Sequence, residues 1–254
     1  MDSSQPAAPA QLDDPLHQMA LQLHTAQAAL VESRRNQSEF LLAMGHDMRS
    51  PLTAVLGYAQ LLDAGVPTPT PSQKSSLAQI MQAGWGLLDL INEIVDASLI
   101  ECGKLQLQME HVSLEDALRE CEVLVEPLAR QSNVHVVFAP PAQLLLVAAD
   151  RTRLRQILMT LLSHALLHSG TTGVVQVSCY RCEDGRLRVN FQDTSCGKST
   201  AWLAHGNPAN HIKLMVSQQL AGYMGGVIAT EFIASTANSA SAYWLELNAA
   251  ALTP

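Results

Sequence analysis

Hydrophobic residues recur at three- and four-residue steps over two long stretches of the first hundred positions, which predicts two amphipathic helices. The first helix is expected from residue 16 to about 63 and the second from 73 to about 102, with a proline-rich break, AGVPTPTPS, between them. Long helices joined by a short loop form an antiparallel hairpin, and one hairpin alone cannot cover its apolar stripe. We therefore predict a helical dimerisation domain over residues 16–103, which pairs with a second copy as a four-helix bundle, after a disordered leader at 1–15.

The pattern changes at residue 104, after which short hydrophobic runs alternate with helical segments up to about residue 250. Ser113, followed three residues later by Asp116, is typical of a helix start. This order predicts an α/β sandwich with helices over one face of a mixed sheet, so that the chain as a whole has an α+β fold. The predicted helices are SLEDALRECEVLVEPLARQ, DRTRLRQILMTLLSHALLHS and HIKLMVSQQLAGYMGG, and the predicted strands are VHVVF, LLLV, VVQVSCYRC, RLRVNFQ, GVIATEFIA and SAYWLELNA.

Composition and charge narrow the possible classes of protein. The chain is 48% hydrophobic and 15% charged, which is typical of a globular protein, and its net charge of -8 without a Lys/Arg run argues against nucleic-acid binding. No apolar stretch approaches the roughly 20 residues of a membrane span and no signal-peptide layout opens the chain, so a cytoplasmic location is expected. Five cysteines without disulfide-scaffold spacing fit a reducing compartment. We predict no metal site, because Cys179 and Cys182 lack a second pair and His164 and His168 lack a nearby carboxylate motif.

The segment FLLAMGHDMRSPLTAVLGYAQLL carries the most specific chemistry in the first predicted helix. An exposed imidazole is a good phosphoryl acceptor, and a neighbouring carboxylate can hold its tautomer and take its proton. His46 and Asp47 supply this pair, and Ser50 lies one helical turn along on the same face. Pro51 lacks an N–H, so the helix can bend beside His46. The segment thus predicts a phosphoacceptor site.

This segment resembles the H-box of sensor histidine kinases from two-component signalling systems. The run LLDLINEIVDASLIECGKLQL is similar to the second helix and the exit of the same HisKA-type dimerisation domain, and the resemblance extends over about residues 35 to 247. It implies that His46 is the phosphate acceptor and that Asp47 assists the transfer. It also implies that Ser50 orients the water that hydrolyses the phosphoaspartate of a partner protein.

The second half of the chain resembles the GHKL-type, or Bergerat, ATPase domain of the same kinases. The scaffold positions match, whereas the nucleotide-contacting positions differ. Asp150, Arg153 and Gln156 are similar to the residues that lead into the family's N-box. Thr160 and His164 stand where the family has two asparagines for Mg²⁺ and phosphate. Because Mg²⁺ prefers hard oxygen ligands, this pair is a poor replacement.

Further departures follow along the same domain. Leu167 stands where the family has a basic phosphate-binding residue, and the D-x-G-x-G motif keeps Asp193 and Gly197 but has Ser195 in place of its first glycine. The family's glycine-rich lid aligns with residues 211–214, whose bulky side chains keep a backbone away from phosphates. Each lost contact costs on the order of 1–3 kcal/mol. The resemblance therefore implies a vestigial nucleotide site at Asp193, Gly197, Thr160 and His164, with ATP and Mg²⁺ as cofactors only if this site still functions.

These observations predict a homodimeric histidine phosphotransfer and phosphatase protein. It would exchange a phosphoryl group between His46 and the aspartate of a response-regulator receiver domain, with an upstream histidine kinase as a further candidate partner. Two alternatives stay open. One is an active sensor histidine kinase that phosphorylates its own His46 with ATP, and the other is a non-catalytic module that sequesters a kinase or regulator.

Overall fold

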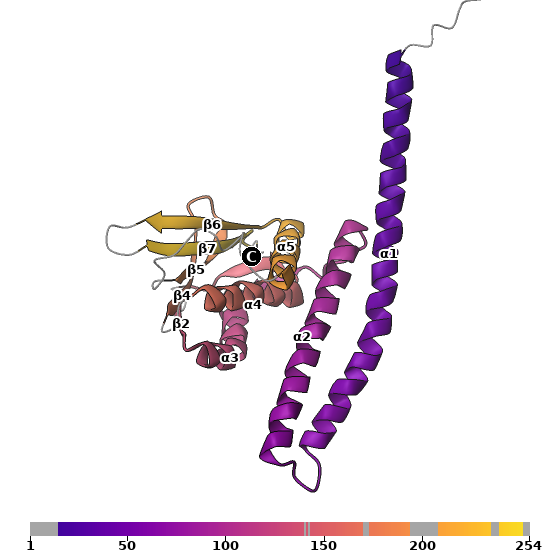
Figure 1. The fold of residues 1–254 in the computed structure, drawn as a ribbon. Coiled ribbons are helices and arrows are strands. Elements are labelled where there is room, and N and C mark those ends of the chain that lie inside the picture. The colour runs from indigo at the N-terminus through magenta and orange to yellow at the C-terminus, as the bar shows by residue number, and fades with distance from the viewer. Residues whose placement is uncertain are drawn as a thin grey trace, which may run out of the picture.

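The structure, a computed structural model, describes residues 15–139, 141, 143–169, 173–193, 208–234 and 239–250. A long helical hairpin stands beside an α/β domain (Figure 1). The hairpin consists of α1 (Pro15–Asp63) and α2 (Pro71–Glu101), as the hydrophobic periodicity predicted. Thr70 begins α2 with a complete capping box, in which its hydroxyl accepts from the Gln73 N–H and the Gln73 side chain accepts from the Thr70 N–H. The leader predicted at 1–15 lies outside the described residues, apart from Pro15, where α1 begins.

Two glycines allow the helices of the hairpin to approach closely. A Cβ placed on Gly45 of α1 would lie 2.3 Å from Cγ2 of Val95, and one on Gly84 of α2 would lie 2.6 Å from Cδ2 of Leu56. Both distances are far shorter than a carbon–carbon contact of about 3.5–4.0 Å. The spacing of α1 and α2 near His46 therefore depends on the absence of a side chain at Gly45.

The α/β domain has a mixed five-stranded sheet whose helices cover one face (Figure 1). The strand order is β2-β4-β5-β7-β6, in which β2 and β4 are parallel and the remaining neighbours are antiparallel. Alternate residues of β5, namely Leu187, Val189 and Phe191, are buried against the helices, as expected for a sheet with one covered face. This architecture confirms the predicted α+β class. The elements are α3 (Leu114–Ser132), α4 (Arg151–His168), α5 (Pro208–Tyr223), β2 (His135–Ala139), β4 (Val174–Arg181), β5 (Leu187–Asp193), β6 (Val227–Ala234) and β7 (Ser239–Leu247).

The prediction of one sheet was wrong in one respect. The run LLLV contributes β3 (Leu146–Ala149), which pairs antiparallel with the unpredicted strand β1 (Glu110–Ser113) in a separate two-stranded sheet. The residues after β7 extend β3 on its other side, since the Ala250 N–H donates to the Leu146 carbonyl at 2.8 Å. A four-residue strand directly before a helix gives too short an alternation to be predicted from the sequence.

Helix α4 lies at the centre of the domain core. Leu154, Ile157, Leu158 and Leu161 have no measurable exposure, because α3 and α5 flank α4 and the sheet lies behind it. Asp150 caps α4 by accepting a hydrogen bond from the Arg153 N–H at 3.0 Å. The buried position of α4 limits which of its polar residues can reach a ligand.

Candidate functional site

The segment predicted to hold the phosphoacceptor lies in the middle of α1. The side chains of His46, Asp47 and Ser50 are all exposed, and α1 continues through Pro51. His46 and Ser50 are one helical turn apart, so both are open to a protein that docks on this part of the hairpin. The structure thus brings the three predicted residues together on an accessible stretch of one helix.

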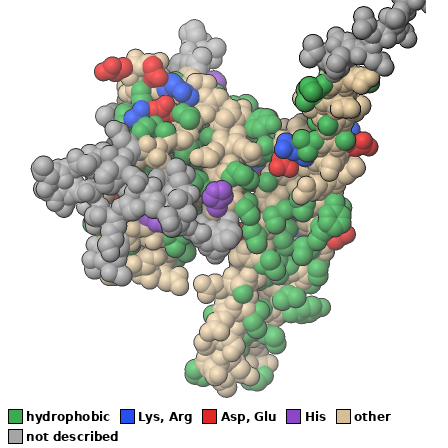
Figure 2. Space-filling model, turned by 45° about the horizontal axis from the view of Figure 1, so that its top comes forward, with side chains coloured by type: hydrophobic (Ala, Val, Ile, Leu, Met, Phe, Trp, Pro, Cys, Tyr) green, Lys and Arg blue, Asp and Glu red, His purple; other side chains and the backbone are tan. Residues whose placement is uncertain are grey.

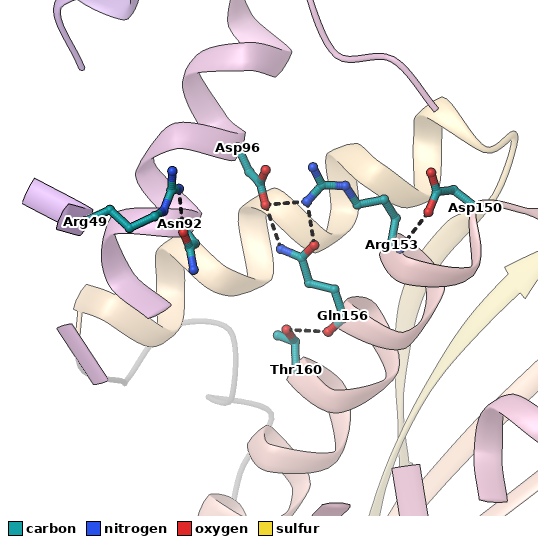
Figure 3. A network of polar contacts seen from close by, with 7 residues as sticks. All are labelled: Arg49, Asn92, Asp96, Asp150, Arg153, Gln156 and Thr160. Carbon is teal, nitrogen blue, oxygen red and sulfur yellow. Dashed lines mark hydrogen bonds and ion pairs between the residues drawn. The ribbon is translucent and has the colours of Figure 1, made fainter. Parts of the chain in front are cut away.

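Two contacts fix this stretch of α1 to α2, and both involve residues whose positioning role the sequence reasoning missed. Gly45, directly before His46, rests on Val95 of α2. Arg49 donates from Nη2 to the side-chain oxygen of Asn92 at 2.7 Å (Figure 3). Within α1, the Thr53 hydroxyl donates to the Arg49 carbonyl at 2.8 Å. The only signal in the sequence was a glycine inside a helix, which usually has a packing reason.

The nucleotide-side residues of α4 are arranged differently. The Thr160 hydroxyl donates to the Gln156 carbonyl of its own helix at 2.9 Å (Figure 3), which ties it to the backbone one turn earlier. His164 is 7% exposed and stacks on His168 with ring centroids 4.3 Å apart. The Leu167 side chain is 62% exposed. Thr160, His164 and Leu167 line a common cavity of about 330 Å³, so the structure does bring these positions together.

Acidic side chains from the hairpin also line this cavity. Asp89 and Glu93 of α2 reach it, together with Lys213 of α5, whose ammonium lies 3.7 Å from an Asp89 carboxylate oxygen. Glu93 is 7% exposed, and its Oε2 has no hydrogen-bond partner among the described residues. Burial raises the pKa of Glu93 to about 7, with a smaller contribution from the charge of Asp96, while Lys213 acts in the opposite direction. The one Lys or Arg among the described lining residues, Lys213, is thus already paired with Asp89, which leaves it less available to an anionic ligand.

Asp193 ends strand β5 and is 5% exposed. The Ser169 hydroxyl lies 3.2 Å from Asp193 Oδ1 and donates to it. Burial lowers the pKa of the neighbouring His168, whereas the charge of Asp193 raises it. The other half of this predicted motif, Gly197 with Ser195, lies outside the described residues.

No group of three or more His, Cys, Asp or Glu side chains in the described part of the chain is arranged to hold a metal ion. Cys179 is buried in β4, where burial raises the pKa of its thiol to about 11, and Cys182 follows the strand in a turn. Within the same described ranges, no helix combines the length and the apolar character that a bilayer crossing requires.

The chain is similar to known signalling proteins. The family model of the His Kinase A (phospho-acceptor) domain matches residues 36–103. The sensor protein GacS of Pseudomonas syringae pv. syringae is 31% identical in a 245-residue alignment that covers 89% of this chain and 26% of GacS. The cell-division control histidine kinase PdhS of Brucella suis is 30% identical over 180 residues, which are 70% of this chain and 17% of PdhS. The chain therefore spans about a quarter or less of the length of these relatives.

Solved structures agree with these sequence relationships. Full-length ShkA, solved in complex with AMPPNP, superposes with a TM-score of 0.67 and 26% identity over 84% of this chain and 46% of ShkA. The Acinetobacter baumannii histidine kinase AdeS superposes with a TM-score of 0.53 over 80% of this chain and 97% of that chain, and at 19% identity it shows the fold alone.

Proposed function

Because this chain belongs to the two-component histidine kinase family, we propose that it acts as a histidine phosphotransfer and phosphatase protein with impaired ATP binding. The observation that carries the proposal is the contrast between an exposed His46 and a cavity beside Thr160 and His164 whose described lining has a single Lys or Arg, Lys213, which is already paired with Asp89. His46 would exchange a phosphoryl group with the aspartate of a response-regulator receiver domain. An upstream histidine kinase would be the original source of this group.

The chemistry of the transfer follows from the residues around His46. A ring nitrogen of His46 attacks the phosphorus of the receiver's phosphoaspartate, a P–N bond forms, the P–O bond breaks and the aspartate leaves as a carboxylate. Asp47 holds the imidazole tautomer and takes its proton. In the phosphatase reaction, Ser50 orients the attacking water. Mg²⁺, which binds hard oxygen ligands, would come with the receiver.

The residues that line the cavity support the proposal that ATP binding is impaired. A triphosphate needs cations and N–H donors, but Asp89 and Glu93 line the cavity and Lys213 is already paired with Asp89. The Thr160 hydroxyl is engaged with its own helix, so it is poorly placed as a ligand for Mg²⁺. Leu167 presents an apolar side chain at the position where the family carries a basic one.

Two assays with the purified chain test the proposal. In the first, the chain is incubated with a panel of ³²P-phosphorylated receiver domains, and label is expected on His46 and absent from the H46Q variant. In the second, labelled ATP and Mg²⁺ are added without a receiver. Stoichiometric labelling of His46 in this second assay would overturn the claim of impaired ATP use.

An active ATP-dependent histidine kinase is the first alternative. It is favoured by the retained Asp193 and by relatives that are themselves named histidine kinases. Calorimetric titration with ATP and Mg²⁺ separates the two functions, because the alternative requires a dissociation constant below the millimolar range.

A non-catalytic module that sequesters a kinase or regulator is the second alternative. The exposed hairpin surface, which offers a docking face without requiring chemistry, favours it. In cells, replacement of His46 by Ala distinguishes the two, because sequestration would leave the signalling output unchanged.

We also propose that two copies of the chain form a four-helix bundle. Figure 2 shows hydrophobic side chains gathered along the hairpin, where a single copy leaves them open to solvent. Burying such a stripe is strongly favourable, at about 25 cal/mol per Å² of apolar surface. Light scattering of the purified chain is expected to give twice the mass of the monomer. The exposed residues include Phe40, Met44, Met48, Val55, Tyr58, Leu62, Ile80, Trp85 and Leu87.

A further inference from the structure

A shielded cluster of polar side chains joins the hairpin to the α/β domain (Figure 3). Asp96 Oδ2 on α2 accepts hydrogen bonds from Arg153 Nη1 at 2.6 Å and from Gln156 Nε2 at 2.9 Å, both on α4. Arg153 Nη1 also donates to Gln156 Oε1 at 2.8 Å. The side chains of Asp96 and Arg153 are only 9% and 22% exposed, so solvent screens this ion pair far less than a surface pair. We call these three residues the α2–α4 clamp.

The first turn of α4 is also tied to the segment that joins the two domains. Asp150, the cap of α4, accepts from the Arg153 N–H through Oδ1 and from the Gln108 N–H through Oδ2 at 2.9 Å. Gln108 lies between the end of α2 and the start of β1. The clamp therefore acts at a place where the connecting segment, α2 and α4 meet.

The same stretch of α2 reaches the phosphoacceptor segment. Asn92 precedes Asp96 by one helical turn and accepts the hydrogen bond from Arg49, which lies three residues after His46. Arg49, Asn92, Asp96, Arg153 and Gln156 line one cavity of about 470 Å³, and the backbone of α2 links the Arg49–Asn92 pair to the Asp96 cluster. A shift of α2 at Asp96 would also displace Asn92, and through Arg49 it would displace the turn of α1 that carries His46.

We propose that Arg153 and Gln156 are positioning residues for phosphotransfer at His46, which rests on the function proposed above. By holding Asp96, they fix α2 against the α/β domain and thereby fix the H-box through Asn92 and Arg49. This role explains why only some residues of α4 match the family pattern. Arg153 and Gln156, which match, bond to Asp96 of the hairpin, and Gln156 also borders the cavity that Thr160 and His164 line. Thr160 and His164, on the next two turns, differ from the family.

The test compares three substitutions on α4 in the full-length chain. R153M removes the ion pair with Asp96, R153K keeps its charge, and R151M is a matched control because it removes the ion pair of Arg151 with Glu120 on α3 without touching the hairpin. Transfer from a phosphorylated receiver to His46 is measured in single turnovers at several receiver concentrations. Hydrogen exchange of the connecting segment, residues 102–109, is measured in parallel.

R153M is expected to lower the transfer rate at saturating receiver about tenfold, because a displaced H-box loses the geometry of attack. The half-saturating receiver concentration should stay within about twofold, since the exposed docking surface of α1 is unchanged, and exchange at 102–109 should increase. R153K should recover most of the rate, and R151M should resemble the wild type. Should R153M fail to fold, Q156A removes the other donor to Asp96 and is judged by the same measurements.

Each result bears on the proposal. If R153M increases exchange but transfers at the wild-type rate, the clamp holds the domains without positioning His46, and the inference is wrong. If R151M slows transfer as much as R153M, the effect does not belong to the clamp, and the inference is again wrong. If the wild-type chain exchanges no phosphoryl group with any receiver, the proposed function fails first and this inference fails with it.

Discussion

The segment of α1 around His46 and the segment of α4 around Thr160 both carry residues on which the resemblance to histidine kinases rests, yet they present them in opposite ways. On α1, only the face with Gly45 packs against a neighbour, and His46 and Ser50 are left open to solvent. On α4, neighbours bury most of the helix. The Thr160 hydroxyl bonds to its own backbone, and the His164 ring packs on His168. A buried helix must satisfy its polar groups internally, which leaves them unavailable to a ligand.

The largest expected effect tests the exposed side of this comparison. Replacing His46 by Gln removes the acceptor nitrogen, so phosphotransfer from any labelled receiver should fall by at least about three orders of magnitude, the scale on which nucleophiles contribute. The fold should be retained, because the side chain is exposed. H24Q replaces another exposed histidine of α1 and should transfer normally. Label that persists in H46Q would show that another residue is the acceptor.

The cavity beside α4 should make stability depend on pH through Glu93. Its pKa is raised from 4.5 to about 7 by burial, so the folded state holds a proton more tightly than the unfolded state. The stability linked to Glu93 is therefore fully present below about pH 4.5, falls as the pH rises toward 7, and is constant above that value. E93Q lacks this pH dependence. The difference in the free energy of unfolding, E93Q minus wild type, should therefore increase by on the order of 3 kcal/mol from pH 4.5 to pH 8.

Urea unfolding of wild type and E93Q at several pH values measures this difference. E122Q, which removes an exposed carboxylate of α3, should keep the wild-type slope. If the free energy of unfolding depends on pH in the same way in wild type and E93Q, Glu93 is solvated. The buried charge beside α4 would then no longer distinguish it from α1.

Restoring the family residues on α4 sharpens the comparison further. The double variant T160N/H164N supplies two amide oxygens at the cavity, and each recovered contact contributes about 1 kcal/mol, so ATP affinity should rise about 10- to 100-fold in a calorimetric titration with Mg²⁺. H168N, one turn beyond His164, does not add an oxygen at the cavity lining and should give no gain. If the double variant also shows no gain, the carboxylates of Asp89 and Glu93 dominate the site.

The sequence predicted the helices and most strands because each is a long, periodic pattern that depends on local residues. It singled out His46 through the residues of the H-box-like segment, and the exposure of His46 fits the outer face of an amphipathic helix. It could not predict that β1 pairs with β3, because strand pairing depends on how the chain folds back on itself. Nor could it predict that Arg153 bonds to Asp96, because these residues are 57 positions apart and meet only when the hairpin packs against the α/β domain. Nor could it predict the direction of the Thr160 hydroxyl, which a side-chain rotation decides.

The smallest expected effect tests the packing that supports the exposed side. G45A places a methyl group against Val95, which costs about 1–3 kcal/mol, while the better helix propensity of alanine returns up to about 1 kcal/mol. The net destabilisation should be about 1 kcal/mol in urea, with slower transfer at His46. G57A lies on the same helix with open space around its Cβ, so it should be neutral or stabilising by up to about 1 kcal/mol. In the double variant G45A/V95A the smaller side chain removes the clash, so transfer should recover. If G45A behaves like G57A, the close approach of α1 and α2 does not position His46.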